Sequence, residues 1–535
     1  MPLFTPIDIA RFINPDRREV IRTLGLGAGF FLTESTVSQH LWAKPFFKAD
    51  PFSLGVASGD PAADGFVIWT RLAPAPLKTA GGMPPVAVEV AWELAADEAF
   101  LKPVRSGKAI AKPAMAHAIH VEIGGLETGR EYFYRFSIEG IRSPVGRAKT
   151  FPVPSAAASI RFVSAGCQRY EDGFFTAWRA IAQERPDFVA HYGDYIYEYK
   201  AIKPDASRPV PIARDMPGMP EKCLTLNDFR QRYAIYKLDP DLQAAHAAAP
   251  FLSSFDDHEV ENNWAGFDSE YEGVSKRAFA LRRAAAFQAW YEHTPLRAAQ
   301  MPKGPDILAY RRFRLGDLLQ VDMLDTRQYR DPQPCGDGWK YCVDARDERR
   351  TMLGKAQESW LFSGFAGKPA RWNLIAQQVP MMRFDRDPDS TLVETHMDKW
   401  DGAEAARKRL FDAAKEAKLA NLVVLAGDVH HNRAAELKVN FDDPASANIG
   451  VEFVATSISS GGDGEAQPKS TSKLMQANPH LKFFNAQRGY VAHTLDAARW
   501  RADYRVLDKV STKDGAASTR ASFVVESGKP VLEKA

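Results

Sequence analysis

A strand, a helix and a second strand are predicted within about 35 residues in the first half of the chain. The apolar run at 160–165 predicts the first strand, and 174–184 has apolar residues on one helical face. A second apolar run begins at Phe188 and ends at Asp194. Two strands joined by one helix lie parallel, so their carboxyl ends meet at one edge of a sheet. We therefore expect Cys167, which follows the first strand, to lie beside Asp194.

Two further apolar segments end in side chains of the types that serve as metal ligands in proteins. Together with the first two strand ends, they offer thiolate, carboxylate, phenolate, imidazole and amide groups. Each motif alone has an ordinary structural explanation as a turn, a helix cap or a buried thiol. Because all four occur in one chain, each after a strand, we predict a metal site. The four groups are Cys167; Asp194 and Tyr197; Asp256, Asp257, His258, Glu259, Asn262 and Asn263; and Asp428, His430 and His431.

The mixture of donors predicts two unlike metal positions that share one carboxylate. Carboxylate and amide oxygens suit calcium, magnesium or manganese, whereas thiolate, phenolate and imidazole suit iron or zinc. Asp194 is the expected bridge, because its strand should lie centrally in the sheet. Paired metals can activate a water molecule and neutralise charge in a displacement at phosphorus.

The overall composition limits the possible partners. A chain of 535 residues is too long for one hydrophobic core, so two or more domains are expected. The formal net charge of +2 gives no electrostatic reason to bind nucleic acid or an anionic membrane. No apolar run reaches the roughly 20 residues that span a bilayer, so we expect no stable membrane anchor. We also expect a monomer.

The N-terminal segment 1–43 resembles a twin-arginine export signal. Arg17 and Arg18 precede a short, glycine-rich apolar stretch, and Ala43 offers a possible cleavage point. The alternative is an ordinary amphipathic helix with a chance pair of arginines. The signal interpretation implies the twin-arginine export machinery as a partner, and a periplasmic or secreted location.

Two regions follow this segment. Residues 50–152 alternate between apolar strands and turns, which favours an all-β sandwich of the fibronectin or immunoglobulin type. After a short linker, residues 158–535 mix strands and helices and contain all the candidate metal ligands, which predicts an α/β domain. In this second region Cys335 and Cys342 lie in a turn-rich segment, where a local disulfide is plausible in an oxidising compartment.

The order of the four motifs resembles the calcineurin-like metallophosphoesterases, and it is closest to the PhoD-like alkaline phosphatases. The resemblance extends over nearly all of residues 50–530. It implies a layered β-sandwich flanked by helices, preceded by the N-terminal β-sandwich. It also rests on five further segments, which are Gly55–Pro61, Trp69–Leu72, Leu324–Arg330, Trp372–Val379 and Trp400–Gly402.

The resemblance implies one ferric ion and one or two calcium ions. The ferric ligands would be Cys167, Asp194, Tyr197 and His430. Asp194 would bridge to calcium, whose other ligands would be Asp257, Asn262 and Asp428. Asn263 is an alternative to Asn262. Asp257 and Asp428 replace an asparagine and a histidine of the superfamily pattern, and both changes agree with calcium.

The resemblance also assigns roles around the metals. His258 would stabilise the transition state. Gln377 or Gln378 stands near the place of a further superfamily histidine. From side-chain chemistry alone, and not from the resemblance, Arg327 and His431 are candidates for contacting phosphate oxygens, because arginine suits bidentate contact with phosphate. The alternative for Arg327 is a structural pair with Asp325.

The expected function is an exported phosphatase that hydrolyses small phosphate monoesters and diesters with a metal-activated water at alkaline pH. One alternative is a dedicated phosphodiesterase, similar to a phospholipase D, that acts on teichoic acids, phospholipid head groups or nucleic acid. A second is a non-catalytic, calcium-stabilised periplasmic binding module. Cys167 and Tyr197 argue against the second, because structural calcium sites do not use thiolate.

Overall fold

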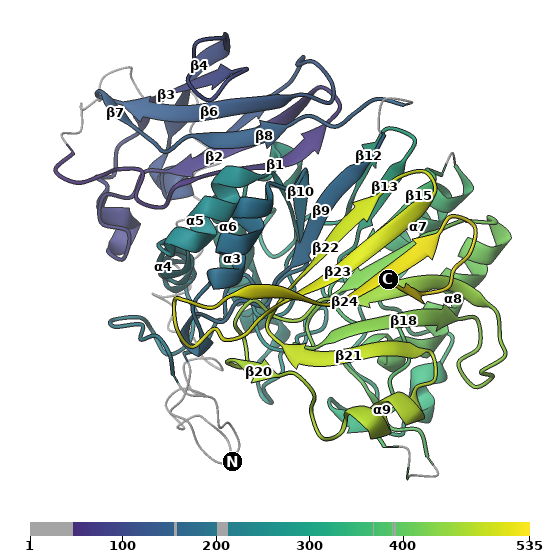
Figure 1. Ribbon diagram of the computed structural model, residues 1–535. Helices are drawn as coiled ribbons and strands as arrows, with labels where there is room; N and C mark the ends of the chain where they lie inside the picture. Colours follow the sequence, from purple (N-terminus) through teal and green to yellow (C-terminus); the bar gives the residue numbers. More distant parts are fainter. Residues whose placement is uncertain (1–46, 155–157, 201–211, 368, 388, 390–391) are drawn as a thin grey trace.

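The computed structural model describes residues 47–154, 158–200, 212–367, 369–387, 389 and 392–535. The predicted export signal at 1–43 lies outside these residues. Within the described part of the chain, no helix combines the length and apolar character needed to cross a membrane. Figure 1 shows a small β region, formed by the first strands of the chain, beside a larger layered region of strands and helices.

A mixed sheet of ten strands contains the predicted strand–helix–strand unit at its centre. β9 (Ile160–Ala165) and β10 (Phe188–His191) flank α3 (Thr176–Glu184) in the chain, and the two strands pair in parallel. β11 (Phe251–Ser253) pairs in parallel with the other side of β10. The outer strands are β22 (Gly489–Leu495), β23 (Arg499–Leu507), β24 (Ala517–Glu526) and β25 (Glu533–Lys534) on one side, and β1 (Val56–Ala62), β2 (Gly65–Arg71) and β5 (Ala118–Ile123) on the other.

A second sheet of eight strands faces the first. Four of its strands, β13, β15, β17 and β19, run parallel, so their carboxyl ends reach one edge. In spatial order the strands are β12 (Arg311–Leu315), β13 (Leu319–Met323), β15 (Trp372–Ala376), β17 (Leu422–Ala426), β19 (Asn448–Val454), β18 (Asn432–Lys438), β21 (Leu481–Gln487) and β20 (Gly464–Glu465).

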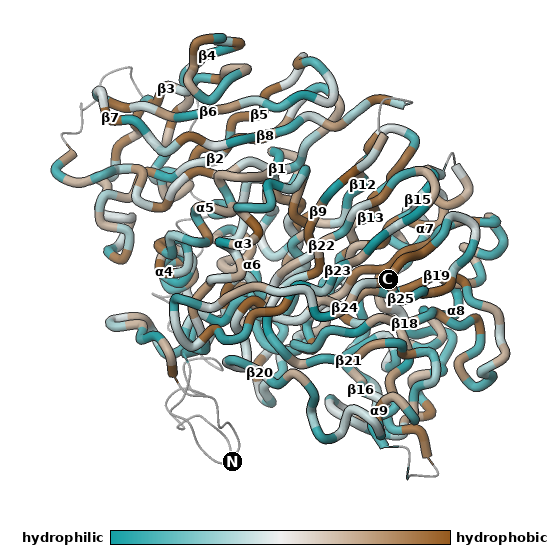
Figure 2. Tube along the Cα trace, viewed as in Figure 1, coloured by the Kyte–Doolittle hydropathy of each residue, from teal (hydrophilic) through white to brown (hydrophobic). Residues whose placement is uncertain are grey.

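The two sheets enclose a common apolar core, and helices cover their outer faces. Phe188 of β10 points into the core, where its ring stacks on Phe162 with 4.6 Å between centroids. The next residue, Val189, points to the opposite face and packs among helices. Figure 2 shows apolar segments along the central strands. The helices are α4 (Leu226–Lys237), α5 (Pro240–Ala248) and α6 (Lys276–His293) with α3 on one face, and α7 (Gly354–Ala366), α8 (Glu404–Glu416) and α9 (Thr471–Ala477) on the other. This arrangement confirms the predicted layered sandwich flanked by helices.

The N-terminal region is all-β, as predicted, but it does not form a sandwich of its own. One layer is a separate five-stranded sheet, whereas the other layer, β1, β2 and β5, continues the ten-stranded sheet. The joint lies at Gly59, which pairs with Phe251 of β11. A side chain at Gly59 would meet the carbonyl oxygen of Pro295 at 2.4 Å, so this close approach requires glycine. The separate sheet contains β3 (Val88–Ala95), β4 (Pro103–Ala111), β6 (Glu131–Ile138), β7 (Ile141–Arg142) and β8 (Gly146–Lys149).

Candidate metal centre

A cavity of about 380 Å³ lies where the ends of the two sheets meet. Asp194 follows β10 and Asp257 follows β11 of the first sheet, whereas Asp428 follows β17 of the second. Residues far apart in the sequence therefore reach one cavity, as the parallel strands predict. The predicted residues that line it are Asp194, Tyr197, Asp257, His258, Asn262, Asn263, Asp428 and His430.

Close packing at the strand ends turns these side chains toward one another. A side chain on Gly166 would meet the ring of Tyr192 at 2.5 Å, and one on Gly427 would meet the same ring at 2.1 Å. Both glycines are thus required for the two sheets to approach across Tyr192. The residues that follow them, Cys167 and Asp428, have left-handed φ angles of 53° and 63°. Such backbone is unfavourable for side-chain-bearing residues and is concentrated at functional sites.

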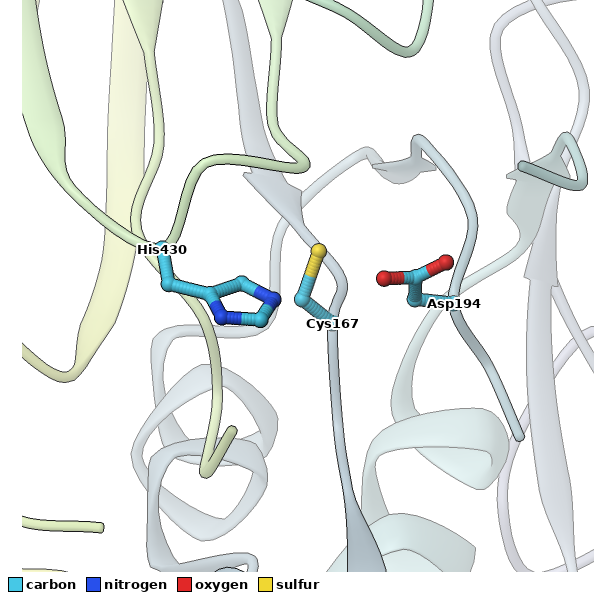
Figure 3. Close-up of side chains that lie close together, drawn as sticks. All are labelled: Cys167, Asp194 and His430. Atoms are coloured by element: carbon cyan, nitrogen blue, oxygen red, sulfur yellow. The ribbon is translucent and has the colours of Figure 1, made fainter. Parts of the chain in front are cut away.

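The predicted iron ligands form one compact group. Ligand atoms of Cys167, Asp194 and His430 all lie within 4.8 Å of one another. Figure 3 shows the thiol of Cys167 between the imidazole of His430 and the carboxylate of Asp194. The hydroxyl oxygen of Tyr197 completes the group, because it lies 2.9 Å from Oδ2 of Asp194 and 3.0 Å from Nε2 of His430.

A second, harder group adjoins the first. Asp194, Asp257 and His258 offer ligand atoms within 4.8 Å of one another, and so do Asp256, Asp257 and Asp428. Asp194 thus belongs to both the soft and the hard group, as a bridging carboxylate must.

Asn262 and Asn263 both lie at the cavity. The amide nitrogen of Asn262 donates to Glu270, and that of Asn263 donates to Asp337 at 2.6 Å. In both residues the nitrogen therefore has a carboxylate partner, and the amide oxygen is the group that could serve a cation.

The electrostatics of these groups fit a bound cation. Burial raises the pKa of the Cys167 thiol well above its ordinary value, and the carboxylate of Asp194 raises it further. Burial followed by the same carboxylate raises the pKa of Tyr197, and burial raises that of Asp194 itself. Oδ1 of Asp194 is buried without a hydrogen-bond partner among the described residues. The anionic forms of these buried side chains are therefore unfavourable in the protein alone. A bound metal ion would stabilise them, because it supplies the opposite charge.

Two predicted phosphate contacts do not line the cavity. Arg327 is fully buried, and its guanidinium donates to Asp256 at 2.6 Å and to Asp398 at 2.9 Å. The backbone nitrogen of Arg327 also donates to Asp325. These contacts favour a structural role for Arg327, although its guanidinium pairs with Asp256 and Asp398 and not with Asp325. His431 stacks on Phe484 with 5.0 Å between ring centroids, and burial lowers its pKa to about 3.

The two predicted glutamine positions also have structural partners. Gln378 accepts from the backbone and hydroxyl of Thr326, and its amide donates to Ser254. The side-chain amide of Gln377 donates a hydrogen bond to the carbonyl oxygen of Val379 and accepts one from its backbone nitrogen. Neither glutamine lines the cavity.

Seven cavity residues were not predicted from the sequence, namely Arg169, Asp172, Tyr199, His396, Lys399, Ser460 and Gly461. Arg169 and Tyr199 lie two residues beyond Cys167 and Tyr197, so the predicted strand ends could have revealed them. The guanidinium of Arg169 lies 4.5 Å from the centre of the Tyr199 ring. His396 and Lys399 come from the segment before Trp400, which carries no strand or motif signal.

Comparisons with known proteins agree with this geometry. The family model described as PhoD-like phosphatase matches residues 162–504, and the model of the PhoD-like phosphatase N-terminal domain matches residues 37–152. Alkaline phosphatase D of Bacillus subtilis (strain 168) is 46% identical over 525 residues, which cover 97% of this chain and 89% of that protein.

Solved structures show the same relationship. A structure of PhoD is 47% identical, with a TM-score of 0.88, and the match covers 92% of this chain and 93% of that chain. A purple acid phosphatase, PPD1 from yellow lupin (Lupinus luteus) seeds, shares the fold at 14% identity and a TM-score of 0.53, over 88% of this chain and 74% of that chain. The chain belongs to the PhoD-like phosphatase family.

Proposed function

We propose that this chain is a metal-dependent phosphatase that hydrolyses small phosphate monoesters and diesters at alkaline pH. The observation that carries the proposal is the position of Asp194, which is shared by a soft and a hard group of ligand atoms beside one cavity. Membership of the PhoD-like phosphatase family supports the same reaction.

The donor sets support a ferric ion and one or two calcium ions. Thiolate, phenolate and imidazole from Cys167, Tyr197 and His430 would hold iron together with Asp194. Asp257, Asp428 and the amide oxygen of Asn262 or Asn263 would complete an oxygen-rich calcium position. When bound, paired metals of this kind supply an activated water and neutralise negative charge on the phosphoryl group. Elemental analysis of protein purified without chelators tests the assignment, because calcium alone would contradict the iron set.

Protein groups on the cavity wall would orient the substrate. Arg169 is 4% exposed and faces the cavity, so its guanidinium can bind a phosphate oxygen without first being desolvated. His258 lies beside Asp194 and Asp257, where its imidazole can donate to charge that develops on phosphate or on the leaving oxygen. Arg327 does not line the cavity and would support the site indirectly, by holding the carboxylate of Asp256 in place.

The export proposal has independent support in the disulfide between Cys335 and Cys342. Disulfides persist in oxidising compartments, which agrees with a periplasmic or secreted location. Fractionation of cells that express the full chain or Arg17→Lys/Arg18→Lys tests this. Retention of the variant inside the cell is expected, and equal export of both proteins would contradict twin-arginine export.

Hydrolysis of p-nitrophenyl phosphate by metal-loaded protein tests the function. Asp194→Ala should lower kcat/KM by several orders of magnitude, because both metal positions lose a ligand. Asp241→Ala is a matched control, since Asp241 pairs with Arg179 at the surface. Equal activity of Asp194→Ala and the wild type would refute the assignment. Bis(p-nitrophenyl) phosphate in the same assay separates a general phosphatase from a dedicated phosphodiesterase.

A further inference from the structure

A short loop closed by a disulfide lies beside the cavity. The disulfide loop comprises residues 335–342, and Cys335 is bonded to Cys342. Its strand β14 (Trp339–Lys340) pairs with β16 (Thr395–His396), so that Trp339 lies opposite His396. Since His396 lines the cavity, this pairing attaches the disulfide loop to the cavity wall.

Asp337 contacts two cavity side chains from within the disulfide loop. Its Oδ2 atom accepts a hydrogen bond of 2.6 Å from Nδ2 of Asn263. Its Oδ1 atom accepts from the backbone nitrogen of Gly338 at 2.6 Å and lies 4.0 Å from Nδ1 of His396. Asn263 and His396 both line the cavity, so one carboxylate links two wall residues.

Asn263 in turn connects the disulfide loop to the metal centre. Its backbone nitrogen donates to Oδ2 of Asp257 at 2.8 Å, and its carbonyl oxygen accepts from Gln333 at 2.7 Å. Its φ angle is 48°, a left-handed conformation that needs support from its surroundings. Without Asp337, the side chain of Asn263 would lose its charged acceptor while the backbone contacts remained.

The backbone of the disulfide loop is of a kind that a crosslink restrains. Cys335, Gly336 and Gly338 all have positive φ angles, of 56°, 79° and 91°. A turn with three such residues has high conformational freedom in the absence of a covalent link. The disulfide therefore limits the positions that Asp337 can take relative to Asn263.

We propose that Asp337 is a positioning residue for substrate binding and that the Cys335–Cys342 disulfide holds it in place. Asp337 orients Asn263 and His396 where the substrate enters, and reduction of the disulfide weakens substrate binding. The proposal rests on the phosphatase function proposed above. A phosphine reductant and one water molecule convert the disulfide into two thiols and a phosphine oxide, which balances the redox step.

Steady-state kinetics on metal-loaded protein test the role of Asp337. Asp337→Ala should raise KM about three- to tenfold, as expected for the loss of one ordinary hydrogen bond at a partly exposed carboxylate, and leave kcat within about twofold. Asp337→Asn is the conservative control. Its amide oxygen can still accept from Asn263, so it should restore most of the affinity. Metal content should be equal in all three proteins, and a lower calcium content in Asp337→Ala would overturn the role in substrate binding in favour of one in metal retention through Asn263.

The disulfide is tested with Cys335→Ser/Cys342→Ser, which should raise KM as Asp337→Ala does. Phosphine reductant should raise the KM of the wild type to the same value and leave the double variant unchanged. Unchanged KM in Asp337→Ala and the double variant would overturn the proposal. So would a reductant effect that persists in the double variant, because that would place the effect at Cys167 or the metals.

Failure of the phosphatase function gives a different result. A folded, metal-loaded wild type that hydrolyses neither p-nitrophenyl phosphate nor its diester contradicts the proposed function. Asp337 is then tested by calorimetric binding of inorganic phosphate, which Asp337→Ala should weaken by the same three- to tenfold factor. Equal binding by the two proteins would overturn the role of Asp337.

Discussion

Nδ1 of His258 lies 2.8 Å from Oε2 of Glu198, and both side chains are buried. Burial alone would raise the pKa of Glu198, but the charge and hydrogen bond of His258 hold that pKa below its ordinary value. The other oxygen of Glu198 accepts from the backbone nitrogen of Asn262 at 2.9 Å. Glu198 thus fixes the orientation of His258 and leaves Nε2 as the ring nitrogen available to the cavity.

Replacement of Glu198 by glutamine should impair the reaction more than substrate binding. Glu198→Gln keeps the shape of the side chain but removes the negative charge that supports the imidazole. We expect kcat to fall about 10- to 100-fold with a small change in KM. Glu404→Gln, which alters an ion pair with Arg346 at the surface, is the control. If kcat of Glu198→Gln stays within about twofold of the wild type, His258 does not depend on this carboxylate.

Tyr197 gives a spectroscopic test of the iron position. Its hydroxyl oxygen contacts Asp194 and His430 and accepts a hydrogen bond of 2.8 Å from Ser460. A phenolate bound to ferric iron absorbs visible light by charge transfer, so the loaded protein should be coloured. Tyr197→Phe should lose this absorption and part of its iron, whereas Tyr199→Phe should keep both. A coloured Tyr197→Phe variant would show that the chromophore lies elsewhere.

The sequence was sufficient to predict which strand ends meet. A strand–helix–strand unit has one favoured hand and direction, so Cys167 and Asp194 had to become neighbours. The second sheet follows the same rule, which brings Asp428 and His430 to the same edge. These positions depend on local patterns and on general topology, and both can be recognised in one sequence.

Side-chain direction and long-range pairing could not be predicted in this way. Arg327 follows a strand that ends near the cavity, but Asp256 and Asp398 hold its guanidinium behind the carboxylates. Lys399 and His396 reach the wall because β16 pairs with β14, a contact between two short strands without sequence signals. The shared layer of the N-terminal region likewise depends on one close approach, at Gly59.

Lys237 predicts a pH dependence of stability. It is 1% exposed, its Nζ lies 4.3 Å from the centre of the Trp69 ring, and burial lowers its pKa to about 7. The unfolded chain keeps the ordinary pKa of 10.5, so between these values it binds one more proton than the folded protein. The free energy of unfolding should therefore rise from pH 7 toward pH 10.5. Below pH 7 the destabilisation that comes from burying Lys237 is fully present.

Lys237→Met removes this proton linkage. At pH 7 the variant should be more stable than the wild type by a few kcal/mol, and the difference should shrink toward pH 10. Urea unfolding of both proteins at several pH values measures the difference in their free energies of unfolding. Because all other titrating groups are present in both proteins, their contributions cancel in this difference. Parallel stability curves for the two proteins would contradict the buried, neutral state of Lys237.

Arg169 is the arginine that we expect to contact phosphate. Its Nε atom lies 4.0 Å from Glu171 and 3.9 Å from Asp172, and within the described ranges Nε and Nη2 have no hydrogen-bond acceptor. Arg169→Met should raise KM for p-nitrophenyl phosphate and the inhibition constant of inorganic phosphate together, each by about 10- to 100-fold. The two constants of Arg169→Lys should lie between those of the wild type and those of Arg169→Met, because lysine keeps the charge but loses the bidentate geometry.

Arg327→Met separates phosphate contact from structural support. Removal of this guanidinium leaves the buried Asp256 without its arginine, which should cost about 3–5 kcal/mol of stability, whereas Asp398 keeps Arg330 and Lys399. Arg169→Met should lower the melting temperature much less, since Glu171 and Asp172 lie 4.0 and 3.9 Å from its Nε atom, beyond hydrogen-bond distance. Thermal unfolding beside phosphate inhibition distinguishes the two arginines. The opposite pattern, with Arg327 controlling phosphate affinity and Arg169 controlling stability, would favour phosphate contact, the other of the two roles that the sequence left open for Arg327.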